Sequence, residues 1–227
     1  MQAPPVLLVH GFASSFERNW RDTGFADLLA DAGREVIGPD LLGHGRAEKP
    51  HDPAAYADLE AGVEEQLPPE GAIDAVGFSL GARVLLGIAS RRPERFLRIV
   101  VGGVGANLFR GGDPEPVARA VEGEVDAEHP VARFFAAAAA GSGNDPKALA
   151  ACLRRPETPL SVEGLARITC PVLVVLGDQD FAGPAEPLME ALPNAQLLTL
   201  SRCDHFATPK DFRFLDATLD FLEAQPA

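Results

Sequence analysis

Three kinds of side chain that cooperate in covalent catalysis are spread along this 227-residue chain: a serine, an aspartate and a histidine. Ser79 has a glycine two positions before it and another two positions after it, and it stands between an apolar run and a helix-like run. This pattern is typical of a sharp strand-to-helix turn that holds a nucleophilic serine. Because a serine hydroxyl alone is a weak nucleophile, the turn requires a histidine base and a carboxylate that orients it. His205, with Asp178 or Asp180, offers those partners.

The elements that must bring these residues together are predicted from the apolar pattern, in which short runs indicate strands and longer runs with helical spacing indicate helices. The predicted strands are 5–9, 35–39, 73–78, 97–101, 171–176 and 196–200, and the predicted helices are 25–32, 53–67, 80–91, 184–192 and a last helix that opens with Thr208 as its cap. This alternation is typical of parallel strands with right-handed helical crossovers. Since parallel strands end at one edge of a sheet, the loops carrying Ser79, the aspartate and His205 are expected to meet there.

The alternation is interrupted at about 106–168, where no β-branched run occurs. Helical pieces are predicted at 131–140 and from Pro146, where Asp145 precedes the proline in a favourable N-terminal arrangement. We expect a single domain over 1–227, with this stretch inserted as a small helical lid.

Several motifs carry a family resemblance: His10-Gly11-Phe12, Asp40-Leu41-Leu42-Gly43-His44-Gly45, Gly77 to Gly81, Gly177 to Asp180 and Asp204-His205. The chain resembles the α/β-hydrolase-fold serine hydrolases, in which serine, acid and histidine follow in this order. The resemblance spans nearly the whole chain except the lid. Members of the family often begin with an antiparallel hairpin, for which the five residues before the first strand leave no room. We therefore expect a shortened, six-stranded, mainly parallel sheet with helices on both faces.

The resemblance also implies roles for individual residues. Asp180 matches the family's catalytic acid in Gly-x-x-Asp, whereas Asp178 is more simply a loop residue that bonds backbone. The backbone amides of Phe12 and Leu80 are the implied oxyanion hole. His10 and His44 are expected to be structural.

Phenylalanines near these positions are expected to form an apolar substrate pocket. They are Phe181 and Phe206, which flank the acid and the histidine, and the lid residues Phe109, Phe134 and Phe135. Alternatively, the lid phenylalanines only anchor the lid to the domain. Arg18 and Trp20 either contact substrate or lie on the surface.

Composition excludes other classes of function. The formal charge of −13 argues against a nucleic-acid partner, because phosphate binding requires a basic surface. No apolar run approaches the ~20 residues of a membrane span, and the N-terminus lacks the basic region of a signal peptide, so we expect a cytoplasmic protein without a membrane partner. The three cysteines lack metal-site spacing and are expected to be free thiols. No metal or organic cofactor is expected, and the protein is expected to be a monomer or a homodimer.

Together these features predict a carboxylic-ester hydrolase that acts on a small or medium, largely apolar ester or lactone. The same triad also serves acyltransferases, carbon–carbon bond hydrolases and perhydrolases, and the sequence does not separate these activities. A ligand receptor that retains the triad is a further alternative. Dehalogenase and epoxide hydrolase chemistry is disfavoured, because those relatives carry aspartate where this chain has Ser79.

Overall fold

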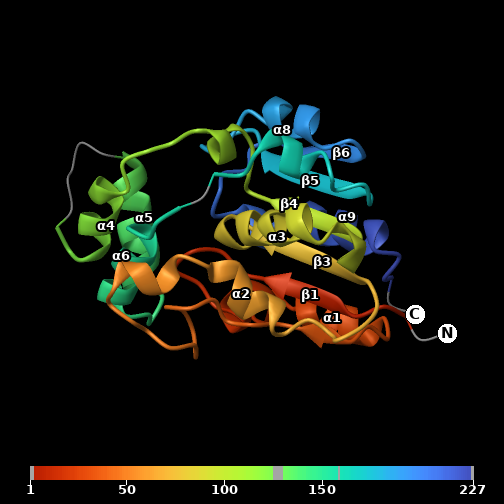
Figure 1. Cartoon of the computed structure of the whole chain (residues 1–227), viewed down its shortest axis with the longest axis horizontal. Helices are drawn as coiled ribbons and strands as arrows, with labels where there is room; N and C mark the ends of the chain where they lie inside the picture. The colour runs from red at the N-terminus through yellow and green to blue at the C-terminus, as the bar shows by residue number, and fades with distance from the viewer. Residues whose placement is uncertain (1–2, 125–129, 158, 226–227) are drawn as a thin grey trace.

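The computed structural model describes residues 3–124, 130–157 and 159–225, which form a sheet of six parallel strands (Figure 1). The strand order is β2-β1-β3-β4-β5-β6, and every neighbouring pair is parallel. The strands are β1 (Val6–Val9), β2 (Val36–Ile37), β3 (Ile73–Phe78), β4 (Phe96–Gly102), β5 (Val172–Gly177) and β6 (Ala195–Leu200). The predicted six-stranded α/β architecture is confirmed, although β2 pairs over only two residues.

Helices cover both faces of the sheet because alternate strand residues point to opposite sides. In β1, Leu7 and Val9 belong to the apolar cluster beneath α2 (Leu59–Glu64), α3 (Leu80–Arg91), α7 (Val162–Leu165) and α8 (Glu186–Ala191). Val6 and Leu8 belong to the cluster on the other face, with α1 (Phe25–Asp31) and α9 (Phe212–Phe221). The strands β1 and β5 are therefore apolar along their whole length, as expected for strands that are buried on both sides.

The helices α4 (Glu115–Val121), α5 (Pro130–Ala140) and α6 (Pro146–Leu153) stand apart from the sheet, at the end toward which the arrow of β1 points (Figure 1). Arg154 fastens α6 to α4 by ion pairs of 2.8 Å to Glu115 and 2.8 Å to Glu122. The predicted cap is present, since the Asp145 side chain accepts a hydrogen bond from the Lys147 amide.

The two ends of the expected lid lie with the sheet domain. The short helix η4 (Ala106–Phe109) bonds to the segment before α8, where the Ala106 amide donates to the Pro184 carbonyl at 2.8 Å. At the other end, Leu165 of α7 and Ile168 are buried in the cluster that contains α3. The part that stands apart is therefore α4 to α6, and residues 125–129 and 158 of the predicted lid lie outside the described residues.

Two local expectations are wrong. The last helix begins at Phe212, where the Asp211 side chain accepts a hydrogen bond from the Arg213 amide, while Thr208 starts a separate single turn. Trp20 lies neither on the surface nor in the substrate cavity, since it is fully buried with Phe25 and Phe214.

The short helices are η1 (Glu17–Arg21), η2 (Pro53–Tyr56), η3 (Pro93–Arg95), η4 and η5 (Thr208–Lys210). No helix among the described residues is long and apolar enough to cross a membrane.

Candidate active site

The turn between β3 and α3 holds Ser79 at φ 53° and ψ −114°, a region that a residue with a side chain rarely occupies. Close backbone packing explains the flanking glycines. A Cβ at Gly77 would lie 2.7 Å from the Cα of Ala82, and one at Gly81 would lie 2.3 Å from the carbonyl oxygen of Val9. The glycines therefore allow α3 to start directly against β1, with Ser79 at the tip of the turn.

A continuous hydrogen-bonded chain links Ser79, His205 and Asp180. The Nε2 atom of His205 lies 2.9 Å from Ser79 Oγ, and its Nδ1 lies 2.9 and 3.0 Å from the two oxygens of Asp180. A carboxylate only accepts hydrogen bonds, so Nδ1 carries the proton and Nε2 can accept the proton of the Ser79 hydroxyl. The side chains of His205 and Asp180 are 3% and 0% exposed, so this pair is shielded from water.

The other aspartates near His205 bond elsewhere. One oxygen of Asp178 accepts a hydrogen bond from the Cys203 amide at 3.3 Å, and one oxygen of Asp204 accepts from the Ala207 amide at 2.9 Å. Of the two candidate acids, Asp180 bonds the ring of His205, whereas Asp178 bonds the backbone of the loop that carries His205.

Aromatic rings enclose the imidazole of His205. The Phe181 ring lies against it at a tilt of 35° with centroids 4.3 Å apart, Phe206 meets it edge-on at 5.3 Å, and Phe78 lies at 5.1 Å. These contacts hold the ring plane while leaving Nε2 directed at Ser79.

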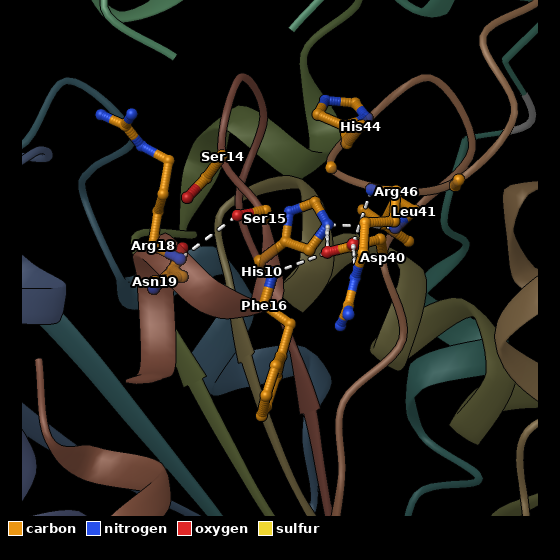
Figure 2. A network of polar contacts seen from close by, with 12 residues as sticks. His10, Ser14, Ser15, Phe16, Arg18, Asn19, Asp40, Leu41, His44 and Arg46 are labelled. Atoms are coloured by element: carbon orange, nitrogen blue, oxygen red, sulfur yellow. Dashed lines mark hydrogen bonds and ion pairs between the residues drawn. The ribbon is translucent and has the colours of Figure 1, made fainter. Parts of the chain in front are cut away.

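The loop after β1 is organised by a neutral His10 (Figure 2). The Leu41 amide donates to His10 Nε2 at 3.0 Å, so the proton of the ring sits on Nδ1, which donates to the Gly11 carbonyl at 2.8 Å. Complete burial lowers the pKa of His10 and keeps it uncharged. Both ring nitrogens of His10 thus form hydrogen bonds with the backbone, which agrees with the structural role expected for this residue.

Asp40 ties this loop to the next one (Figure 2). Its two oxygens accept hydrogen bonds from the amides of Phe16 and Arg46, each at 2.8 Å. His44 belongs to the Asp40 loop, and its ring contacts the ring of His10 with centroids 5.3 Å apart. Its Nδ1 bonds the Leu42 carbonyl, and burial lowers its pKa to about 3. The Asp40 motif therefore fixes the position of the His10 loop.

The backbone amides of Phe12 and Leu80 lie on neighbouring segments beside Ser79. Gly11 packs so closely on Phe78 that a Cβ would lie 2.8 Å from its ring, which brings the loop after β1 against the turn after β3. Neither amide donates a hydrogen bond to an acceptor among the described residues. Both N–H groups are thus available to a bound molecule.

A cavity of about 760 Å³ opens over Ser79 and His205. Its apolar lining includes Phe12, Phe134, Phe135 and Phe206, and its polar lining includes Ser14, Arg18, Asn19, Asp22, Thr23, Asp204 and Lys210. Phe134 and Phe135 come from α5, so the separate helices supply part of the cavity wall.

Phe109 and Phe181 are placed differently from the sequence expectation. Phe109 lies outside the cavity and packs against the apolar cluster of the sheet domain. Phe181 lies against His205 and contacts Phe135 at 5.8 Å, but it is not part of the cavity wall. The structure thus brings Phe134, Phe135 and Phe206 to the cavity, together with Arg18.

Sequence reasoning missed Asn19, which lines the cavity and is only 5% exposed. It lies in η1, a single π-helical turn, and its side-chain oxygen accepts a hydrogen bond from the Gly11 amide at 3.0 Å. A single asparagine beside a tryptophan carries no periodic signal, so only the fold reveals this contact. No group of three or more histidine, cysteine, aspartate or glutamate side chains in the described part of the chain is arranged to hold a metal ion.

Comparison with known proteins assigns the chain to a family. The chain belongs to the alpha/beta hydrolase family, whose model matches residues 6–217.

Individual relatives include enzymes of more than one kind. A 2-hydroxymuconate semialdehyde hydrolase of Pseudomonas putida is 35% identical over 109 residues, which are 46% of this chain and 38% of that protein. Among solved structures, one from a study of carboxylesterases of Nitrososphaera gargenis matches this chain with a TM-score of 0.76 and 21% identity. The match covers 98% of this chain and 90% of that one. A 2-hydroxy-6-oxo-6-phenylhexa-2,4-dienoate hydrolase from Rhodococcus sp. strain RHA1 matches with a TM-score of 0.69 and 22% identity over 98% and 92% of the two chains. The structural matches establish the fold, and the sequence match spans less than half of the curated relative.

Proposed function

We propose that this α/β hydrolase is a serine hydrolase that cleaves carboxylic esters through an acyl-enzyme. The observation that carries the proposal is the chain of hydrogen bonds from Ser79 through His205 to Asp180 at the floor of an open cavity. These three groups supply a nucleophile, a general base and a carboxylate that orients the base.

The geometry supports a two-stage reaction. Ser79 Oγ attacks the ester carbonyl while His205 Nε2 takes the hydroxyl proton, and the Asp180 carboxylate stabilises the resulting imidazolium. The free amides of Phe12 and Leu80 are the proposed donors to the oxyanion that develops on the carbonyl oxygen. His205 then gives its proton to the leaving alcohol. A water molecule then attacks the acyl carbonyl while His205 takes its proton, and the bond to Ser79 Oγ breaks as His205 returns that proton to the serine, which releases the carboxylic acid.

The cavity favours small to medium, largely apolar substrates. Phe135 contacts Phe12 at 5.6 Å and Phe206 at 5.7 Å, and these rings form a continuous apolar wall beside Ser79. A cavity of about 760 Å³ lies within the usual range for sites that bind small molecules. We propose that the acyl group packs on this wall.

The experiment is hydrolysis of p-nitrophenyl esters of increasing acyl length by the wild type and by Ser79→Ala. We expect turnover of short to medium esters and a loss of kcat on the order of 10⁶ in the variant. A fluorophosphonate should label the wild type and leave Ser79→Ala unlabelled. Labelling that persists in the variant would refute Ser79 as the nucleophile, and absence of turnover on any ester, with ligand binding unchanged by the substitution, would indicate a receptor.

A second candidate function is hydrolysis of a carbon–carbon bond beside a carbonyl. The observation that favours it is the match to the Pseudomonas putida enzyme, which is named for 2-hydroxymuconate semialdehyde, a compound without an ester group. The two functions separate when kcat/KM is measured for that semialdehyde and for p-nitrophenyl butyrate with one preparation. We expect the ester to be the better substrate, and a preference of 100-fold or more for the semialdehyde, roughly 3 kcal/mol, would replace the esterase proposal.

A further inference from the structure

The loop after β1 contains a local irregularity at η1, where the chain winds into a single π-helical turn. Its defining hydrogen bond runs from the Asp22 amide to the Glu17 carbonyl at 2.8 Å, five residues apart. Such turns are rare in proteins and occur frequently at functional sites. Here the turn directs Asn19 and Trp20 inward, with exposed fractions of 5% and 0%, between the exposed side chains of Glu17 and Arg21.

The buried Asn19 side chain acts on the peptide that precedes Gly11. Its Oδ1 accepts the Gly11 N–H at 3.0 Å, while His10 Nδ1 donates to the Gly11 carbonyl at 2.8 Å. Asn19 therefore fixes the plane of the peptide before Gly11, and His10 fixes the plane of the peptide after it. Because peptides are planar and trans, the N–H of Phe12 points opposite to the Gly11 carbonyl, so the His10 contact sets its direction, and the Asn19 contact fixes the peptide plane on the other side of Gly11.

The other end of the Asn19 side chain shows that packing alone does not account for the residue. Its Nδ2 is buried and has no hydrogen-bond partner within the described residues. An unpaired buried donor costs about 1–3 kcal/mol, which a leucine of similar size would avoid. An aspartate would also accept from Gly11, but it would bring a buried negative charge beside the proposed oxyanion site. Asparagine is the residue of this shape that accepts from Gly11 without a charge.

We propose that Asn19 is a positioning residue of the oxyanion hole: by holding the N–H of Gly11, it keeps Gly11 in place so that the Phe12 amide, whose plane His10 holds, is directed at the carbonyl oxygen of the substrate. The inference rests on the proposed acyl transfer at Ser79. It adds a residue outside the triad, because Asn19 makes no hydrogen bond to Ser79 or His205.

The test compares an ester with its thionoester, in which sulfur replaces the carbonyl oxygen. Sulfur accepts hydrogen bonds poorly, so the ratio of the two rates measures how much the amide donors contribute. In Asn19→Leu we expect kcat for the ester to fall at least about tenfold with a smaller change in KM, and the oxo-to-thiono ratio to fall about fivefold or more. Both rates come from one preparation, so the ratio does not depend on the fraction of folded protein.

Two further variants make the result specific. Asn19→Asp keeps an acceptor for Gly11, so we expect its oxo-to-thiono ratio to stay near the wild-type value even where both rates fall. Glu17→Ala removes only an exposed ion pair of 3.5 Å with Arg21 on the same turn, and we expect both its rates and its ratio to match the wild type.

The outcomes distinguish the inference from the proposed function. A ratio unchanged within twofold in Asn19→Leu, or a ratio that falls equally in Asn19→Asp, would overturn the positioning role while leaving the esterase intact. If Asn19→Leu does not fold, the Asp variant still decides, since a collapsed ratio there contradicts the proposal. Absence of ester turnover in the wild type would instead reject the proposed function.

Discussion

Gly103 offers a test of how closely the position of His205 limits catalysis. This glycine follows β4 at φ +69°, and a Cβ there would lie 2.7 Å from Phe78 Cε2, 3.0 Å from His205 Cε1 and 3.2 Å from His205 Nδ1. Gly103→Ala therefore places a methyl group against the edge of the imidazole that carries the bond to Asp180.

The magnitude follows from these distances. A comfortable carbon contact is about 3.5–4.0 Å, so the ring must shift by about 0.5 Å or more. Since a misplacement of 1 Å reduces rates about 100-fold, a shift of half that size corresponds to roughly tenfold in kcat. The left-handed backbone adds about 1 kcal/mol of strain. Crowding against Phe78 adds about 1–3 kcal/mol, so the variant is expected to lose roughly 2–4 kcal/mol of stability.

Gly33→Ala is the matched control. Gly33 has φ +73° and no atom within 4 Å of an added Cβ, so it carries the same backbone strain without any contact. We expect this variant to lose about 1 kcal/mol in urea unfolding and to keep the kcat of the wild type on p-nitrophenyl butyrate. Equal kcat in Gly103→Ala and Gly33→Ala, measured well below their unfolding transitions, would refute the view that the ring position is limiting.

Further predictions concern the acid, the cavity wall and the thiols. Asp180→Asn should lower kcat about 10⁴-fold, because its NH₂ group can donate to Nδ1 of His205 and leave the ring proton on Nε2, whereas Asp178→Asn should change kcat less than about threefold; a larger loss in the second would reassign the acid. Phe135→Ala should raise the ratio of hexanoate to butyrate turnover about tenfold by lengthening the cavity, and an unchanged ratio would place the acyl group elsewhere. Burial raises the pKa of Cys152 and of Cys170 to about 11, so their thiolates are suppressed in the native state. Alkylation of these thiols by iodoacetamide at pH 8 should therefore be about 200-fold slower in native protein than in urea, and equal rates would contradict their burial.

Much of the site follows from local sequence. Gly77 and Gly81 mark the turn because the backbone of Ala82 and Val9 leaves no room for a Cβ, and such a steric demand is visible in residue type alone. The strands were found because burial on both faces requires unbroken apolar runs, as in Val172–Gly177. Parallel pairing then places the loops of Ser79 and His205 at one edge whatever the details of the side chains.

Residue pattern alone is insufficient where a position depends on contacts between distant segments. The spacing within Gly177 to Asp180 leaves both carboxylates open, and the choice of Asp180 came from the family resemblance; in the structure, the path of the loop after β5 places Asp180 on His205 and Asp178 on the Cys203 amide. Likewise Phe109 and Phe135 are the same type of residue, yet Phe109 packs on the sheet domain and Phe135 lines the cavity. The difference arises because their helices, η4 and α5, lie in different parts of the fold.

The sequence by itself therefore determined the strained turn at Ser79, the order of the chemical groups and the parallel sheet that gathers them, because these depend on local sterics and on apolar periodicity. Only the tertiary structure decided the direction of each side chain. It pairs Asp180 with His205. It also places the π-helical turn so that the side-chain oxygen of Asn19 accepts the N–H of Gly11, 8 residues away. Hydrogen bonds across loops require donor–acceptor distances within a few tenths of an ångström. The packing of the fold sets these distances, and they cannot be read from the order of residues.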